Sequence, residues 1–186
     1  MKTDRRTIKT NKALKQALLK MLNSSELEKI TISKLCETAD VSRMAFYYHY
    51  EDIYHLYNKI EEEFFNEFSS LFDKSESHDY RIQMENLLVY LRDNADAVKH
   101  FATKSDSGRF RTRFASILED QFKKIVSYEM GTEEMSDHLE YMVTYHSSGI
   151  YAVYMKWIES DFAWPNEMVL NLIHEIDEAC DKLYYH

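Results

Sequence analysis

The hydrophobic positions in the first third of the chain recur at helical spacing and are separated by short polar breaks. Thr31 is placed to cap a second helix and Ser42 a third, because hydroxyl groups accept hydrogen bonds from free N–H groups of a first helical turn. Asp40 lies between these two helices, where the chain must reverse, and Asp tolerates a left-handed backbone. The pattern therefore predicts a helix-turn-helix. The first helix, over about residues 4–22, has the inner stripe Leu14, Ala17, Leu18 and Met21.

The third of these helices, over residues 43–50, is crowded with aromatic side chains. Phe46 and Tyr50 are four residues apart, so both can face the core of the helix-turn-helix. Tyr47, Tyr48 and His49 cannot all point inward with them, because neighbouring residues on a helix face different directions. Rings with polar tips on an outer face suit contacts with phosphate oxygens. This favours DNA binding over the alternative, an ordinary helical hairpin with an aromatic core.

The rest of the chain continues the helical pattern. Glu51 and Asp52 open a fourth helix, because negative charge suits the dipole at a helix N-terminus. Thr132 is placed to cap an eighth helix and Asn166 a ninth. The other expected helices cover residues 84–91, 95–103 and 110–126, with Gly131 ending the last, and the eighth helix continues to about residue 159.

These elements predict an all-α fold of about nine helices in three parts. Residues 1–50 are expected to bind DNA, residues 51–72 to form a connecting helix, and residues 73–186 to form a helical domain for dimerisation and effector binding. Three Gly and one Pro in 186 residues also favour helices, because turns in β proteins consume both. The three Gly are isolated, which excludes the Gly-rich phosphate loops of Rossmann and P-loop proteins.

Charge is distributed unevenly along the chain. Residues 1–50 contain ten Lys and Arg against five Asp and Glu, a net charge of +5. The whole chain carries −9, so residues 51–186 carry −9 − 5 = −14. A basic N-terminal quarter on an acidic body indicates a local contact with a polyanion.

The sequence offers no positive case for an enzyme. No two His share the i, i+4 spacing of a helical metal pair, and no Ser or Cys has a recognisable nucleophile context, so we expect neither a metal nor a cofactor. Cys36 and Cys180 are expected to be buried thiols. The N-terminus has no apolar signal region, and no apolar run approaches the roughly 20 residues of a membrane span. We expect a cytoplasmic protein.

One segment resembles the DNA-binding domain of TetR-family transcriptional regulators. The resemblance covers about residues 5–72, with a weaker likeness to Gram-positive members around residues 149–157. Two positions depart from the family pattern: Asp40 replaces the usual Gly of the turn, and Ile53 replaces a Lys that touches phosphate. The matching residues are Ile30-Thr31, Leu35-Cys36, Ala39-Asp40-Val41-Ser42 and Phe46-Tyr47-Tyr48-His49-Tyr50.

The resemblance implies a sequence-specific DNA-binding regulator, a repressor released by a small-molecule effector, that binds a palindromic operator as a homodimer. Tyr47 and His49 would hold phosphates. Phosphate support would come from the second helix and its cap, and base contacts from the exposed face of the third. The supporting residues are Thr31, Ser33, Lys34 and Ser42, and the base-facing residues are Arg43, Met44, Ala45 and Tyr48.

Two further sets of residues are candidates in the C-terminal domain. An apolar or aromatic effector would be bound by rings with polar tips on central helices: His100, Phe101, Phe114, Tyr145 and His146. A dimer interface would be formed by the last two helices: Ser148, Gly149, Ala152, Leu172 and Ile176. Gly149 could instead mark a helix crossing within one subunit. The alternative function is a helical protein-interaction module or co-activator that acts with a partner subunit and has no pocket of its own.

Overall fold

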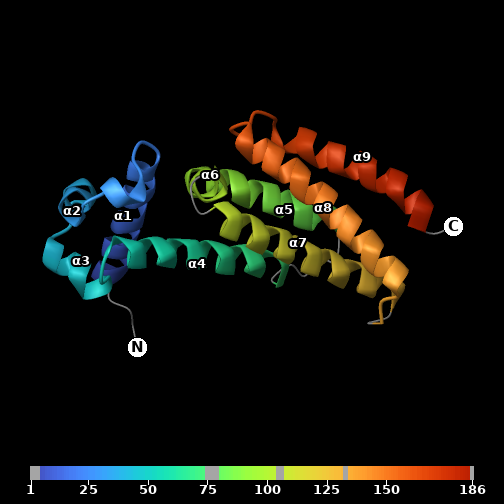
Figure 1. Cartoon of the computed structure of the whole chain (residues 1–186), viewed down its shortest axis with the longest axis horizontal. Helices are drawn as coiled ribbons and strands as arrows, with labels where there is room; N and C mark the ends of the chain where they lie inside the picture. The colour runs from blue at the N-terminus through green and yellow to red at the C-terminus, as the bar shows by residue number, and fades with distance from the viewer. Residues whose placement is uncertain (1–4, 74–79, 104–106, 132–133, 185–186) are drawn as a thin grey trace. The chain divides into compact units, whose positions relative to one another are not determined.

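The computed structural model describes residues 5–73, 80–103, 107–131 and 134–184. In these residues the chain forms nine α-helices, one 3-10 turn and no strand, which confirms the predicted all-α fold (Figure 1). The chain divides into two compact units, Met1–Glu67 and Phe68–His186, and the division falls within α4. None of the described helices combines the length and the apolarity that crossing a lipid bilayer requires.

The first unit is built around a small apolar core. Its helices bury Leu14, Leu18, Leu35 and Phe46, each with no exposed surface. The predicted helical stripes therefore do face one another, and α1 packs against both α2 and α3. The elements are α1 (Arg5–Leu22), the 3-10 turn η1 (Leu27–Lys29), α2 (Ile32–Ala39), α3 (Arg43–His49) and the start of α4 (Ile53–Asp73).

The second unit is a bundle with an aromatic core. Phe110 and Phe114 are fully buried on α7, and their ring centroids lie 5.7 Å apart. α8 packs against α6, α7 and α9, and Figure 1 shows it lying between α7 and α9. The helices are α5 (Tyr80–Asp93), α6 (Ala95–Thr103), α7 (Ser107–Met130), α8 (Asp137–Glu159) and α9 (Asn166–Tyr184).

Two predicted helix starts in this unit are wrong. α8 begins at Asp137 and is capped by Ser136, whose hydroxyl accepts from the Leu139 N–H at 3.4 Å. The predicted cap, Thr132, lies outside the described residues. A hydroxyl at either position looks equivalent in the sequence, and only the Ser136 position coincides with the start of the helix.

Asn166 is the second correction, because it is the first residue of α9 and does not cap it. Its amide oxygen instead accepts a hydrogen bond from Arg92 Nε at 2.5 Å. The backbone oxygen of Pro165 accepts from the Met168 N–H at 3.0 Å and starts the helix. A contact that joins residues 74 positions apart has no signature in the local sequence.

Arg92 makes several contacts with the turn between α8 and α9. Arg92 on α5 donates to the backbone oxygens of Phe162 at 3.2 Å and Trp164 at 2.6 Å. Its guanidinium lies 5.1 Å from the centroid of the Trp157 ring. Asp161 and Phe162 both have left-handed φ values, 60° and 55°, at this turn. The turn therefore needs tertiary contacts to hold a backbone that side chains rarely adopt.

Candidate nucleic-acid interface

The turn between α2 and α3 has the geometry of a helix-turn-helix. Thr31 Oγ1 accepts from the Lys34 N–H at 3.3 Å, and Ser42 Oγ accepts from the Ala45 N–H at 3.2 Å. Asp40 between the helices has φ 52° and ψ 47°, so it is in the left-handed region. Both predicted caps and the predicted left-handed turn residue are confirmed. Local hydrogen bonding thus fixes where each helix begins.

The two faces of α3 divide as the spacing predicts. Phe46 is fully buried and Tyr50 is 6% exposed, with their ring centroids 5.8 Å apart. Met44 and Tyr48 are 83% and 82% exposed, and Tyr47 is half exposed. Large apolar surface that faces solvent on so short a helix is costly unless something covers it. The outer face of α3 therefore has the character of a contact surface.

The other DNA-binding candidates surround this face. Ala45 and His49 are half-buried on α3. Lys34 pairs with Glu37 one turn along α2, at 2.9 Å, and the lysine holds the pKa of that carboxyl below its usual range. An exposed pair of this kind is weak, so the lysine remains able to contact a phosphate. The remaining candidates, Thr31, Ser33, Ser42 and Arg43, are all exposed.

The start of α4 contacts the residue that ends α3. Asp52 Oδ1 accepts from the His55 N–H at 2.7 Å and so caps the helix. Ile53 is only 8% exposed, so it belongs to the core and does not take over the phosphate contact of the family lysine. Tyr50 packs on His55 with ring centroids 5.8 Å apart. Burial, with a smaller contribution from the negative charge of Glu63, raises the pKa of Tyr50 to about 12.

The structure does not bring the five effector candidates together in one pocket. Phe101 and Phe114 both contact Phe110 in the aromatic core, and His100 is buried beside Phe101. Tyr145 lies on the outer face of α8 and is 77% exposed. The sequence could not separate these environments, because α8 carries apolar or aromatic residues on every side. The effector assignment remains a prediction.

His146, the fifth effector candidate, points into the second unit. Its ring stacks on Phe122 of α7, with centroids 4.4 Å apart and planes 15° apart. Its Nε2 lies 2.7 Å from Asp177 Oδ1 on α9. Beneath this pair, the buried Tyr154 hydroxyl donates to Met84 Sδ at 3.2 Å. Burial, and secondarily the charge of Asp177, raises the pKa of Tyr154.

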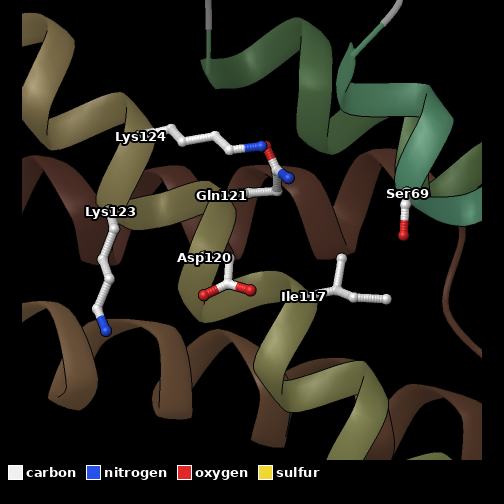
Figure 2. A pocket seen from close by; sticks show the side chains of 6 residues that line it. All are labelled: Ser69, Ile117, Asp120, Gln121, Lys123 and Lys124. Atoms are coloured by element: carbon white, nitrogen blue, oxygen red, sulfur yellow. The ribbon is translucent and has the colours of Figure 1, made fainter.

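Three hollows in the second unit differ in their suitability for a ligand. The first lies on α7 near the end of α4, has a volume of about 370 Å³ and is shown in Figure 2. Five of its six lining residues are polar or charged, which does not suit an apolar effector, and none of the five effector candidates lies in it. Figure 2 labels its residues: Ser69, Ile117, Asp120, Gln121, Lys123 and Lys124.

The second hollow lies between α5, α7 and α8 and has a volume of only about 10 Å³, roughly the volume of one water molecule. Met84, Phe122 and Ile150 are among its lining residues. The third is an open groove of about 650 Å³ along α8 and α9. Tyr145 and His146 line this groove. Among the described residues, no group of His, Cys, Asp and Glu could hold a metal ion.

Three of the five dimer-interface candidates, Ser148, Gly149 and Ile176, line the same groove. Ser148, Gly149 and Ala152 are exposed on α8, and Ile176 of α9 is 45% exposed. A β-carbon added at Gly149 would meet no atom within 4 Å. The alternative of a helix crossing at Gly149 within one subunit is therefore wrong. Leu172 is half-buried on α9.

The helix-turn-helix with an exposed recognition helix, joined to a helical bundle, defines the class of DNA-binding regulators. A family model described as a transcriptional regulator C-terminal region of the TetR type matches residues 78–177, more than half of the chain. This protein belongs to the TetR family of transcriptional regulators and is a DNA-binding regulator of transcription. A search of curated proteins found no significant match.

Solved structures with the same fold include several regulators. The dihydroxyacetone kinase operon activator DhaS is 22% identical, and the alignment covers 94% of this chain and 97% of that one with a TM-score of 0.69. A TerR/AcrR-family regulator from Aquifex aeolicus VF5 is 14% identical over 91% of this chain and 98% of its own, with a TM-score of 0.70. A TetR-family regulator from Streptomyces coelicolor is 13% identical over 89% and 78%, with a TM-score of 0.62. At these identities the likeness shows the fold alone.

Proposed function

We propose that this protein is a homodimeric repressor that binds a palindromic operator and is released by a small apolar or aromatic effector. The observation that carries DNA recognition is the outer face of α3, where Met44 and Tyr48 are more than four-fifths exposed beside Arg43. A recognition helix enters the major groove with such a face toward the bases. The net charge of +5 over residues 1–50 supplies the attraction to phosphate.

Roles can be assigned along the two helices. Arg43, in the first turn of α3, would donate to guanine O6 and N7, and Met44 and Ala45 would contact thymine methyl groups. Tyr48 would complete the base-facing surface. The phosphate-facing residues, which give affinity without sequence preference, would be Tyr47 and His49 of α3 with Thr31, Ser33, Lys34 and Ser42.

The test is a fluorescence-anisotropy titration with a duplex selected from random DNA, repeated over a range of salt concentrations. About four to six phosphate contacts per dimer predict a slope of log K against log[salt] of about −4 to −5. Lys34→Ala should reduce this slope by about 2 per dimer, because each copy loses one phosphate contact. Lys29→Ala is a matched control, since Lys29 is also exposed and pairs with a glutamate three residues away. A slope near zero would contradict the proposal.

The exposed side of α8 supports dimerisation. Residues 141–155 contain no Asp, Glu, Lys or Arg, although 30% of the whole chain is charged. A solvent-facing helix surface is normally charged, and depletion of charge is typical of the core of an interface. Six positions in this stretch are exposed: Tyr141, Thr144, Tyr145, Ser148, Gly149 and Ala152.

Gly149→Glu tests this interface, because the new charge would be buried without a partner at both symmetry-related positions. Sedimentation velocity should show a monomer, and circular dichroism should show unchanged helicity. Operator affinity should fall when the dimer is lost, because a monomer binds only one half-site. A variant that stays fully dimeric at low concentration would place Gly149 outside the interface.

Effector binding between α5, α7 and α8 would require the second unit to open. The cavity between α5, α7 and α8 has the volume of about one water molecule, whereas ligand pockets typically measure about 300–1,000 Å³. A ligand that binds there would have to separate these helices, and such a movement would couple effector binding to operator release. The alternative function, a protein-interaction module without a pocket, is not favoured by membership of the family. A reporter gene behind the selected operator distinguishes repression from activation.

A further inference from the structure

Asp177 is a buried carboxylate whose two oxygens accept no well-directed hydrogen bond from the described residues. It lies on α9 at the edge of the α8–α9 groove and is 9% exposed. Its Oδ1 lies 2.7 Å from His146 Nε2, but its Oδ2 is buried and accepts no hydrogen bond from the described residues. The nearby Tyr154 hydroxyl donates to Met84 Sδ instead. A carboxylate in this position needs a donor that the described residues of one chain do not provide.

The same groove presents donors that lack acceptors. Tyr141 and Tyr145 lie one turn apart on α8 and are 79% and 77% exposed. Neither hydroxyl has a hydrogen-bond partner among the residues that the structure describes. Two large rings therefore project from a helix face that carries no charged side chain. Their hydroxyls are neutral donors of the kind that a buried carboxylate requires.

The groove is also shaped to receive a ring. Gly149 lies one turn beyond Tyr145 on the same side of α8, and no atom lies within 4 Å of the position that a β-carbon would occupy there. The face thus combines a projecting ring with a hollow of about 650 Å³. In a two-fold interface each copy contributes the same surface, so the ring of one copy can fill the hollow of the other.

We propose that, in the dimer, Tyr145 of each copy enters the α8–α9 groove of the other over Gly149 and donates its hydroxyl to Asp177 Oδ2. This inference rests on the proposed dimer and adds a polar contact that specifies it. Because the contact is symmetric, it occurs twice and fixes the register of the two copies. Buried polar residues in helical interfaces set register and partner choice in this way. The contact would also favour self-association over pairing with relatives that lack either residue.

Sedimentation equilibrium of the full chain tests the proposal. Tyr145→Phe keeps the ring but removes the donor, so the dimer Kd should rise about 10- to 100-fold. Tyr141→Phe is the matched comparison, because it removes a hydroxyl from an equally exposed ring one turn away. It should raise Kd far less than Tyr145→Phe, because the proposed contact gives its hydroxyl no buried acceptor. Circular dichroism should show the same helicity in all variants, since neither ring is buried in one chain.

A double-mutant cycle assigns the acceptor. Asp177→Leu removes the carboxylate that needs a donor, so adding Tyr145→Phe to it should change Kd less than about threefold. Independent, additive effects of the two substitutions would overturn the pairing. So would a wild-type Kd for Tyr145→Phe or an equal loss for Tyr141→Phe. If Asp177→Leu does not fold, the comparison of Tyr145→Phe with Tyr141→Phe still tests whether the Tyr145 hydroxyl stabilises the dimer.

The failure of this inference is distinguishable from failure of the proposed function. A wild-type protein that is monomeric at micromolar concentration and binds one half-site would overturn both the dimer and the tyrosine contact. A wild-type dimer that binds the selected operator, with Tyr145→Phe equally dimeric, would overturn the tyrosine contact and leave the proposed function intact.

Discussion

Arg92→Ala should destabilise the second unit by several times more than an ordinary surface substitution. Arg92 is exposed, yet its guanidinium donates to two backbone oxygens of the α8–α9 turn and to the Asn166 amide. Each such bond contributes about 1 kcal/mol at a partly exposed site. The contact with the Trp157 ring adds about 0.5–1 kcal/mol. The expected loss is about 2–4 kcal/mol, allowing for screening by solvent.

Two substitutions calibrate this loss. Arg92→Lys keeps the charge but not the planar fork, and a single ammonium cannot reach all three acceptors, so about half the loss should remain. Arg81→Ala is the matched control: Arg81 lies on the same helix and donates to Asn171 of α9 at 3.2 Å. The exposed hydrogen bond from Arg81 to Asn171 should contribute less than about 1 kcal/mol.

Urea denaturation, monitored by tryptophan fluorescence, measures the loss in the free energy of unfolding at the α8–α9 turn. Both tryptophans of the chain, Trp157 and Trp164, lie at the α8–α9 turn, so the signal reports this region of the second unit. The midpoint should shift to lower urea with little change in slope. The reasoning is refuted if Arg92→Ala lies within about 0.5 kcal/mol of the wild type or costs no more than Arg81→Ala.

Two further predictions concern the first unit. Arg43→Ala should relax preference at one base pair per half-site and cost about 1–3 kcal/mol against the best operator, while Tyr47→Phe should weaken binding to all sequences alike. Selection from random DNA with each variant separates these effects. The pKa of Tyr50 is raised to about 12, from about 10 in an unfolded chain, so its neutral form stabilises the fold fully below pH 10. That contribution should be lost as pH rises through 12, and thermal melts at pH 9 and 11 should show a smaller alkaline loss for Tyr50→Phe.

Features of the fold that depend on neighbouring residues could be predicted from the sequence. The caps at Thr31 and Ser42 and the left-handed Asp40 all follow from hydrogen bonds within four residues. The inward direction of Phe46 and Tyr50 follows from helical spacing alone. These constraints are local, because all the groups that they involve lie within a few residues of one another in the sequence.

Features that depend on distant residues could not be predicted. Asn166 has the side chain of a helix cap, but a hydrogen bond from Arg92 uses its oxygen. Tyr145 and His146 are adjacent in sequence, yet one faces solvent and the other Asp177. Nothing in the apolar pattern of α8 distinguishes its two sides, so the effector candidates chosen from that pattern fall in different environments.

Gly149 shows how the two kinds of information combine. Gly within a helix costs about 1 kcal/mol relative to Ala, so its presence calls for an explanation. The sequence leaves two explanations open: a helix crossing within one subunit and a contact between two subunits. The open space around Gly149 removes the first reason. No packing among the described residues accounts for the missing side chain, and Asp177 Oδ2 in the same groove accepts no hydrogen bond from these residues. Both costs are offset if a second copy supplies the close approach and the hydroxyl, which favours one common explanation for two independent observations.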